Sequence, residues 1–404
     1  MEIRVPGGID LLTSVRPDTT EGAETSNTVD LVCFSHLRWD FVSQRPQHLL
    51  SRCARDRRVF FFEEPIFDST EGVWLDVSER ACGVTVAVPR LPEGLSGDEA
   101  IRAQRALVDE LLLDGALTDY VAWFYTPMAL AFADHLRPRA VVFDCMDELS
   151  AFKNAPAALK EFEAKLMSRA DVVFTGGQSL FEAKRDRHEN IHAFPSSIDA
   201  AHFGAARTVR HDPPDQAGIP HPRMGFFGVI DERLDIDLVA GVADLRPDWQ
   251  IVMIGPVVKI DPADLPQRPN IHYLGGKRYE ELPEYVAGWD VAIMPFARNE
   301  STRFISPTKT PEYLAAGRPV VSTSIRDVVR PYGERGLVET ADTPDAFVAA
   351  IDRVVACERS DRAAWLERVD AFLAHTSWDS TWERMWRHIE AAIESRSLSA
   401  GRSQ

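Results

Sequence analysis

The sequence has little of what builds disulfide frameworks or metal sites. Its 404 residues include five cysteines, which are odd in number, widely spaced and never arranged as Cys-x-x-Cys. This pattern argues against disulfides and a zinc site, and it indicates a reducing compartment. The histidines are scattered, without an HExxH run or a close His/Asp cluster. We therefore expect no bound metal and no cofactor.

Long apolar runs and a net positive charge are also absent. No stretch approaches the ~20 apolar residues of a membrane-spanning helix, and the N-terminus lacks the basic start and apolar run of a signal peptide. The formal net charge of -17 argues against a nucleic-acid partner, because phosphate binding needs a basic surface. We expect a cytoplasmic protein, and the charge does not exclude a nucleotide in a local pocket.

What is present is an alternation of short apolar runs with amphipathic segments. The apolar content of 45% and charged content of 26% are those of a globular protein. Runs that are apolar on both faces are typical of parallel strands covered by helices. In the first half, strands are expected at 29–36, 58–64, 83–89, 120–125, 140–145, 171–177 and 190–195. In the second half, they are expected at 223–230, 249–256, 270–276, 290–296 and 318–324.

The repeated alternation predicts two doubly wound α/β domains instead of one large sheet. The proline-rich, polar segment between the halves predicts a linker. Spaced tryptophans and isoleucines predict a terminal helix that needs a partner groove, with Ser380 and Glu383 as its capping box. The expected parts are a flexible leader (1–28), a first domain (29–207), a linker (208–222), a second domain (223–376), the helix (377–396) and a flexible tail (397–404).

The strongest local signal is the segment SPTKTPEYLAAGRPVVSTS, residues 306–324. Pro311 suits the first turn of a helix and Gly317 its end. The free N–H groups of a helix N-terminus favour a phosphate, and Ser306, Thr308 and Lys309 lie beside it. Glu312 could accept hydrogen bonds from a ribose, or it could simply complement the helix dipole.

This segment resembles the nucleotide-sugar-binding motif of family 4 glycosyltransferases, in the group 1 superfamily with the GT-B fold. In that family a glutamate pair precedes a small-Gly-x-Pro-Val-Val run, and the second glutamate, which binds the donor ribose, matches Glu312. The first glutamate would fall at Phe304. The resemblance implies two Rossmann-like domains facing across a cleft. It also implies sugar transfer that retains configuration and needs no metal.

Other segments extend the resemblance over residues 29 to 393. GFFGVIDERLD (225–235) resembles the strand and glycine loop that opens the family's second domain, which implies that Gly228 and Arg233 face the donor phosphates. Arg303 is a further candidate for neutralising the leaving diphosphate. FPSSIDAAHF (194–203) resembles the family's domain-crossing segment, and the terminal helix fits its return to the first domain.

The first domain is expected to bind the acceptor. His36 and Arg38 follow the first strand, and Asp147 follows a later one. Ligands bind at this end of strands in open α/β sheets, so these three are the candidate catalytic residues. Alternatively, Trp39 and Phe41 cap the sheet while Arg38 pairs with a neighbouring aspartate.

The predicted function is transfer of a sugar from a nucleoside diphosphate sugar to a hydroxyl acceptor, in envelope polysaccharide or other glycan biosynthesis. The alternatives are a non-catalytic nucleotide-sugar-binding or scaffold subunit, and another GT-B activity such as sugar-nucleotide epimerisation. The expected partners are the nucleotide sugar and a glycan, lipid-linked or small-molecule acceptor. Basic clusters at 52–58 and 184–188 leave peripheral contact with the inner membrane face as an open alternative.

Overall fold

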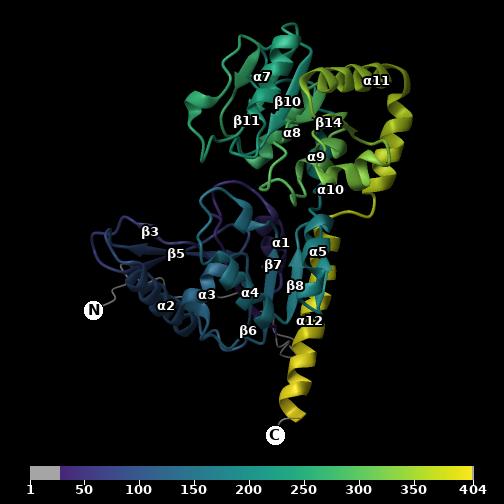
Figure 1. Ribbon diagram of the computed structural model, residues 1–404. Helices are drawn as coiled ribbons and strands as arrows, with labels where there is room; N and C mark the ends of the chain where they lie inside the picture. Colours follow the sequence, from purple (N-terminus) through teal and green to yellow (C-terminus); the bar gives the residue numbers. More distant parts are fainter. Residues whose placement is uncertain (1–27, 403–404) are drawn as a thin grey trace, which may run out of the picture.

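The protein is built from two parallel β-sheets, each in its own lobe (Figure 1). The computed structural model describes residues 28–402, apart from the side chains of 357–360 and 399–402. The predicted leader falls almost entirely outside the described residues. The two-lobed α/β architecture agrees with the prediction of two doubly wound domains.

The first sheet contains the seven strands predicted for it, together with two that were missed. Its order is β3 (Ile66–Phe67), β5 (Val84–Leu91), β2 (Val59–Phe62), β1 (Asp30–Phe34), β6 (Tyr120–Phe124), β7 (Ala140–Cys145), β8 (Val172–Thr175) and β9 (Ile191–Ala193), with β4 (Trp74–Glu79) antiparallel to β5. The missed strands, β3 and β4, lie at the edge of the sheet. Only half-buried there, they lack the two-sided apolar pattern that marks the central strands.

The second sheet contains the five predicted strands and a short edge strand. Its order is β12 (Ile271–Tyr273), β11 (Gln250–Ile254), β10 (Arg223–Phe227), β13 (Val291–Met294), β14 (Val320–Ser322) and β15 (Glu339–Thr340). Every pairing in this sheet is parallel. The carboxyl ends of all its strands therefore point to one edge, where ligands bind in such sheets.

Helices cover both faces of the first sheet, which explains why its strands are apolar throughout. Leu31 and Cys33 of β1 pack on the side of α1 and α12, whereas Val32 and Phe34 pack on the side of α2, α3 and α4. This alternation follows from the two-residue period of a strand. The helices of this lobe are α1 (Arg45–Cys53), α2 (Gly97–Asp114), α3 (Leu130–Ala133), α4 (Leu159–Arg169) and α5 (Gln178–Lys184).

The remaining helices belong to the second lobe, apart from the last. They are α6 (Ala200–Gly204), α7 (Ile236–Leu245), α8 (Leu282–Ala287), α9 (Lys309–Ala315), α10 (Arg326–Val328) and α11 (Pro344–Leu373), followed by α12 (Trp378–Arg402). Helix α9 contains Pro311, as the sequence predicted, and Gly317 follows it with φ +71°. That left-handed backbone conformation is one that glycine adopts without a Cβ clash.

The chain crosses between the lobes earlier than the predicted linker. Ile198, Phe203 and Ala206 already belong to the core of the second lobe. The segment predicted as a linker is packed on that lobe: the buried Gln216 side chain donates to Tyr285 O and accepts from Trp289 Nε1, each at 3.0 Å. Prolines and polar residues here mark an irregular segment on the surface of a core, not a spacer between domains.

The terminal helix returns to the first lobe, as predicted, and runs along β7 and β8 (Figure 1). Its tryptophans pack into the core beside α1. Its start agrees with the predicted one to within one residue, but the predicted capping box was wrong: the helix begins at Trp378, and Ser377 Oγ accepts from the N–H of Ser380 at 3.0 Å. The predicted tail also differs, because the helix continues to Arg402.

A buried ion pair joins the elements that meet where the chain crosses. Arg45, at the start of α1, donates through Nε to Asp144 Oδ2 of β7 at 2.9 Å. Its Nη1 donates to Phe194 O in the crossing segment at 2.7 Å, and its Nη2 lies 3.7 Å from Met385 Sδ of α12. The arginine side chain is 2% exposed and the aspartate 0%.

Replacing Arg45 should therefore destabilise the first lobe strongly. We expect Arg45→Met to lower the free energy of unfolding by about 3–5 kcal/mol, because Asp144 would remain buried without its charged partner. Urea denaturation followed by tryptophan fluorescence measures the change. The matched control is Arg55→Met, which removes an exposed arginine paired with Asp379 and should cost about 1 kcal/mol or less. Equal losses in the two variants would contradict this role for the ion pair.

Candidate active site

A cleft of about 860 Å³ lies between the two lobes and is lined by both of them. Seven of the ten predicted site residues line this cleft. From the second lobe these are Gly228, Arg233, Ser306, Thr308, Lys309 and Glu312, and from the first lobe Asp147. His36, Arg38 and Arg303 do not line it. The fold thus gathers residues that are more than 160 positions apart in the sequence.

Gly228 follows β10 and lines the cleft next to Lys309. Its φ is +137°, and a Cβ atom there would lie 2.2 Å from Lys309 Cε and 2.6 Å from Lys309 Nζ. Only glycine therefore permits this approach. A second glycine, Gly255 at the end of β11, has φ +147°, and its Cβ would lie 1.9 Å from Gly228 O. Two adjacent strand ends are kept free of side chains directly beside the ammonium group.

Lys309 and Glu312 lie one turn apart on α9, where Lys309 is half-buried and Glu312 is buried. Burial lowers the pKa of Lys309, with the nearby Arg233 charge acting in the same direction. Burial also raises the pKa of Glu312, against the opposing effect of Lys309. Glu312 is 6% exposed, and its Oε2 has no hydrogen-bond partner among the described residues. Helix α9 is itself fixed to β10, because Phe227 N donates to Tyr313 Oη at 2.9 Å.

Arg233 reaches the cleft already paired with an acid of its own loop. Its Nε and Nη2 donate to the two carboxylate oxygens of Asp231 at 2.9 and 2.7 Å. Asp231 is 5% exposed and holds the guanidinium group in one orientation. A ligand in the cleft would contact a guanidinium group that is fixed in position and partly neutralised, and this group would attract an anion less strongly than an unpaired arginine.

Asp147 is the predicted catalytic residue that the structure places in the cleft. It follows β7, and burial raises its pKa to about 6, with Arg233 across the cleft opposing that shift and Asp231 adding to it. The next residue, Glu148, is held by the buried ammonium of Lys184 at 2.7 Å. The loop that carries Asp147 is therefore anchored within the first lobe.

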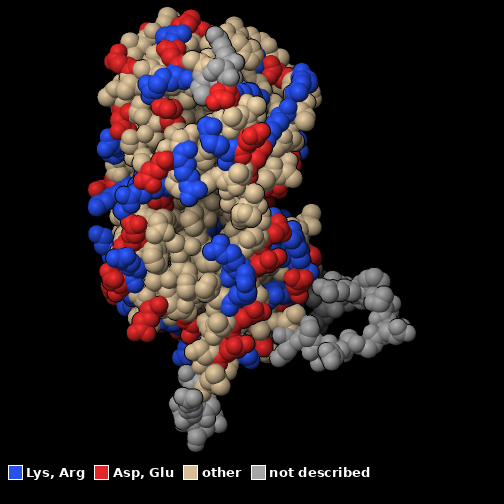
Figure 2. All heavy atoms as spheres, turned by 90° about the vertical axis from the view of Figure 1, so that its right-hand side faces the viewer, with Lys and Arg blue, Asp and Glu red and all other residues tan. Residues whose placement is uncertain are grey.

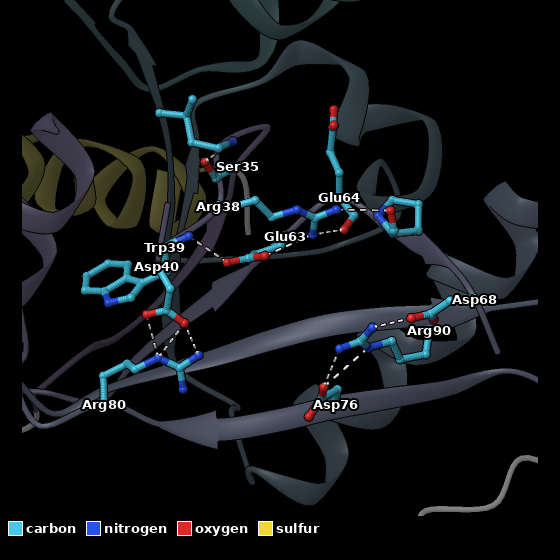
Figure 3. A network of polar contacts seen from close by, with 12 residues as sticks. Ser35, Arg38, Trp39, Asp40, Glu63, Glu64, Asp68, Asp76, Arg80 and Arg90 are labelled. Atoms are coloured by element: carbon cyan, nitrogen blue, oxygen red, sulfur yellow. Dashed lines mark hydrogen bonds and ion pairs between the residues drawn. The ribbon is translucent and has the colours of Figure 1, made fainter. Parts of the chain in front are cut away.

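Arg38 does not line the cleft, and it holds the loop after β1 by binding groups that follow β2, as Figure 3 shows. Its Nη1 donates to Glu63 Oε2 at 2.9 Å and also to Glu64 O, and its Nη2 donates to Pro65 O at 3.2 Å. The alternative pairing with Asp40 is also wrong, because Asp40 binds Arg80. The adjacent strand β2 supplies the nearer acceptors, which the spacing along the chain does not reveal.

Neither His36 nor Arg303 lines the cleft. Burial and the charge of Lys259 lower the pKa of His36 to about 4, so it is neutral at physiological pH, and its buried Nδ1 has no hydrogen-bond partner in the part of the chain that the structure describes. Arg303 follows a tight turn in which Asn299 Oδ1 accepts from Ser301 N at 3.0 Å. That turn directs the Arg303 side chain outward, where it is 62% exposed.

Tyr279 was missed by the sequence analysis and lies in the cleft. Its ring stacks on His202 at 4.3 Å and meets the edge of His48 at 5.3 Å, which in turn stacks on Trp378 at 4.7 Å. This aromatic stack spans both lobes. Tyr279 Oη is buried and has no hydrogen-bond partner within residues 28–402 as described, and burial together with Glu312 raises its pKa. A single tyrosine before a short helix carries no signal of this role in the sequence.

Basic side chains in both clusters of the first lobe are paired with other groups of the fold. In the first, the partners are Asp379 for Arg52 and Arg55, Asp30 for Arg58 and the ring of Trp386 for Arg57. In the second, Lys184 is 3% exposed and binds Glu163, as does Arg187. Most of these basic groups are therefore paired within the fold, and peripheral contact with the membrane stays a prediction. Within the described part of the chain, no helix has the length and apolarity to span a bilayer.

Residues 221–357 match the family of group 1 glycosyl transferases. The matched residues lie in the second lobe, which is called the glycosyltransferase domain below. A Bacillus subtilis (strain 168) protein, TuaH, named for glycosyl transfer in teichuronic acid biosynthesis, is 27% identical over 239 residues. That alignment covers 53% of this chain and 58% of the relative, so the two correspond over little more than half of their lengths.

Solved structures resemble almost the whole chain. Sucrose-phosphate synthase from Thermosynechococcus elongatus superposes with a TM-score of 0.67 at 13% identity, covering 90% of this chain and 100% of that one. Trehalose-6-phosphate from E. coli, bound with UDP-2-fluoro glucose, gives 0.62 at 14% identity, covering 90% and 99%. Anabaena HepE, in complex with UDP and glucose, gives 0.60 at 13% identity, covering 90% and 100%. These similarities establish the GT-B fold.

Lys309 and Glu312 of the glycosyltransferase domain should make ligand affinity depend on pH in both directions. The pKa of Glu312 is raised, so on acidification this carboxylate should take up a proton at a pH above the ordinary glutamate pKa of ~4.3. The pKa of Lys309 is lowered, so as the pH rises this ammonium should lose its proton at a pH below the ordinary lysine pKa of ~10.4. A diphosphate needs the ammonium group and ribose hydroxyls need the carboxylate. Affinity for a nucleoside diphosphate sugar should therefore be greatest near neutral pH and fall on either side.

Calorimetry across this pH range measures the effect with UDP-glucose, whose diphosphate has no proton to release near neutrality. In Glu312→Gln the fall in affinity at acidic pH should disappear, while the fall at alkaline pH should remain. If the affinity of this variant still falls at acidic pH, a group other than Glu312 causes that fall.

Proposed function

We propose that this protein transfers a sugar from a nucleoside diphosphate sugar to a hydroxyl acceptor, with retention of configuration and without a metal ion, in polysaccharide or other glycan biosynthesis. The glycosyltransferase domain binds the donor, and the first lobe binds the acceptor. The donor is a substrate, and no further cofactor takes part. The site of action in this proposal is the cytoplasm, where nucleotide sugars are available.

The observation that carries this proposal is a half-buried ammonium group, Lys309, one helical turn from a buried carboxylate, Glu312, whose Oε2 has no hydrogen-bond partner among the described residues. Placing charged groups in a buried position without a partner costs free energy, and a ligand with complementary groups recovers it. An ammonium group suits a diphosphate, and a carboxylate 6% exposed suits a pair of hydroxyl groups. Gly228 lets the diphosphate approach Lys309 closely because it has no side chain. A nucleoside diphosphate carries both complementary groups in one molecule.

The reaction assigned to the cleft breaks the bond between the anomeric carbon and the diphosphate oxygen. The acceptor oxygen forms the new bond to that carbon, and its proton passes to the leaving diphosphate. Lys309 and Arg233 stabilise the negative charge that develops on the leaving group. Asp147, across the cleft, accepts a hydrogen bond from the acceptor and orients it.

The similarities to known proteins support the substrate classes. One relative is named for a polysaccharide glycosyltransferase, and two of the similar structures hold UDP or a UDP-sugar. A uridine nucleotide is therefore the first donor to test. The acceptor then belongs to a growing glycan or to its small-molecule or lipid-linked precursor.

Removing the Glu312 carboxylate should weaken donor binding without unfolding the chain. We expect Glu312→Ala to lower the affinity for UDP-glucose by ~1–3 kcal/mol, as for other hydrogen bonds to charged groups. Calorimetry measures it, and circular dichroism verifies the fold. The matched control is Glu280→Ala, which removes an exposed carboxylate that does not line the cleft. Unchanged affinity in a folded Glu312→Ala protein would refute the ribose assignment.

Turnover should survive removal of divalent metals. No group of three or more His, Cys, Asp or Glu side chains within the described residues is arranged to hold a metal ion. Lys309 and Arg233 provide positive charge at the leaving group in its place. We expect the rate of UDP release from UDP-glucose to be unchanged in excess EDTA. Loss of this rate in EDTA, with recovery on adding magnesium or manganese, would overturn the metal-independent mechanism.

A further inference from the structure

The two walls of the cleft differ in charge. The glycosyltransferase domain lines it with four cations, of which Arg233, Lys277 and Arg278 are paired with Asp231, Asp215 and Glu281, whereas Lys309 has no ion pair among the described residues. The first lobe contributes a single cation, Arg45, and this group is unavailable: it is 2% exposed and bound to Asp144. The donor wall is therefore suited to an anion, and the opposite wall is not.

The charges that remain on the first-lobe wall do not favour an anion either. Asp40 is neutralised by Arg80, with Nη2 and Oδ2 2.7 Å apart. Asp147 has no ion-pair partner among the described residues. A phosphate or carboxylate on the acceptor would meet this carboxylate without a compensating cation on the same wall.

An aromatic ring stands at the rim of that wall. Phe41 lines the cleft and is 52% exposed, whereas its neighbour Trp39 is 8% exposed and packs against Phe61. An exposed aromatic side chain beside a polar cleft offers a flat apolar surface. The ring faces of sugars carry C–H groups that can lie on such a surface, while their hydroxyls reach polar groups nearby.

The three residues before Phe41 are held by polar contacts, as Figure 3 shows. Arg38 is bound to Glu63, and Trp39 N donates to Glu63 Oε1 at 2.7 Å. Asp40 is bound to Arg80 of the β4–β5 hairpin. A loop whose backbone is held in place loses less conformational freedom when a ligand binds to it.

One cation outside the lining residues lies close enough to be considered. Lys259, an exposed residue of the second lobe, has its Nζ 5.2 Å from the Phe152 ring and lies near Asp147, His36 and Glu64. His36 is neutral, so Lys259 is the group that would serve an anionic acceptor. Its substitution therefore belongs in the test.

We propose that the first-lobe wall binds a neutral sugar residue as acceptor, with its apolar face on Phe41 and a hydroxyl on Asp147, and that it discriminates against phosphorylated and acidic sugars. This inference rests on the proposed function, because it assigns the acceptor half of the same cleft. Phe41 is then the specificity-determining residue and Arg38 a positioning residue that holds its loop.

Acceptor binding by the full-length protein tests this assignment. Saturation-transfer NMR in the presence of UDP compares methyl glucoside and methyl N-acetylglucosaminide with glucose 6-phosphate and glucuronate. We expect the neutral sugars to bind more tightly than the charged ones. Phe41→Ala should weaken their binding about three- to tenfold, Phe41→Trp should preserve it, and UDP affinity should be the same in all variants. The matched control is Phe67→Ala, which removes a phenylalanine 43% exposed that does not line the cleft.

Three results would overturn the assignment. One is tighter binding of glucose 6-phosphate or glucuronate than of the neutral sugars, with loss of that binding in Lys259→Ala. Another is equal binding of neutral sugars by Phe41→Ala and the unaltered protein. The third is UDP binding without binding of any neutral sugar. Failure to bind any nucleotide would instead refute the proposed function, so the two failures are distinguishable.

Discussion

The buried ion pair between Arg45 and Asp144 is the interaction on which the geometry of the cleft depends. It joins the first turn of α1 to the end of β7, and the same guanidinium group binds the crossing segment at Phe194 and contacts α12 through Met385. Both passages of the chain between the lobes are thereby tied to one side chain. Asp147 follows β7 by two residues, so its position also depends on this contact. A charged pair in a buried place adds little net stability, but it allows few alternative arrangements, since any shift leaves a charge without its partner.

The second-lobe side of the cleft differs, because two of its polar groups lack a hydrogen-bond partner among the described residues. Glu312 is buried with its Oε2 unpartnered, one turn of α9 from the half-buried Lys309 and beside strand ends kept free of side chains by Gly228 and Gly255. A ligand with matching groups would recover the free energy that such unsatisfied groups cost in the unliganded protein. Tyr279 Oη is the second of these groups, and the stack of its ring on His202 and His48 extends to the junction of the lobes. A ligand that contacts Tyr279 would therefore also act on the junction of the lobes.

The first lobe shows how residues of catalytic type can instead serve a scaffold. Arg38, Asp40, Glu63 and Arg80 form a connected set of polar contacts, and each charge has a partner within it (Figure 3). Their effect is to hold the loop between β1 and α1 in one conformation at the rim of the cleft. The same holds for Lys184 and Glu163, which anchor the loop that carries Asp147. Few groups on this side remain free to contact a ligand, and Phe41 and Asp147, which line the cleft, are among them.

The sequence by itself predicted the central strands, the division into two α/β lobes and seven of the residues that line the cleft. Short runs that are apolar on both faces favour covered strands, and Gly228, Lys309 and Glu312 lie at fixed offsets from a strand end or a helix start, so local rules place them. Tertiary structure alone decided the surroundings of Arg38, Arg303 and Phe41. Whether an arginine is free or paired depends on which acceptor another strand brings near, and β2 brings Glu63 to Arg38 from 25 residues away. The exposure of Phe41 likewise depends on what packs around it. The chain crosses between the lobes where residues 194–203 resemble the family's domain-crossing segment, whereas only packing decided that the irregular segment before β10 covers the core of the second lobe.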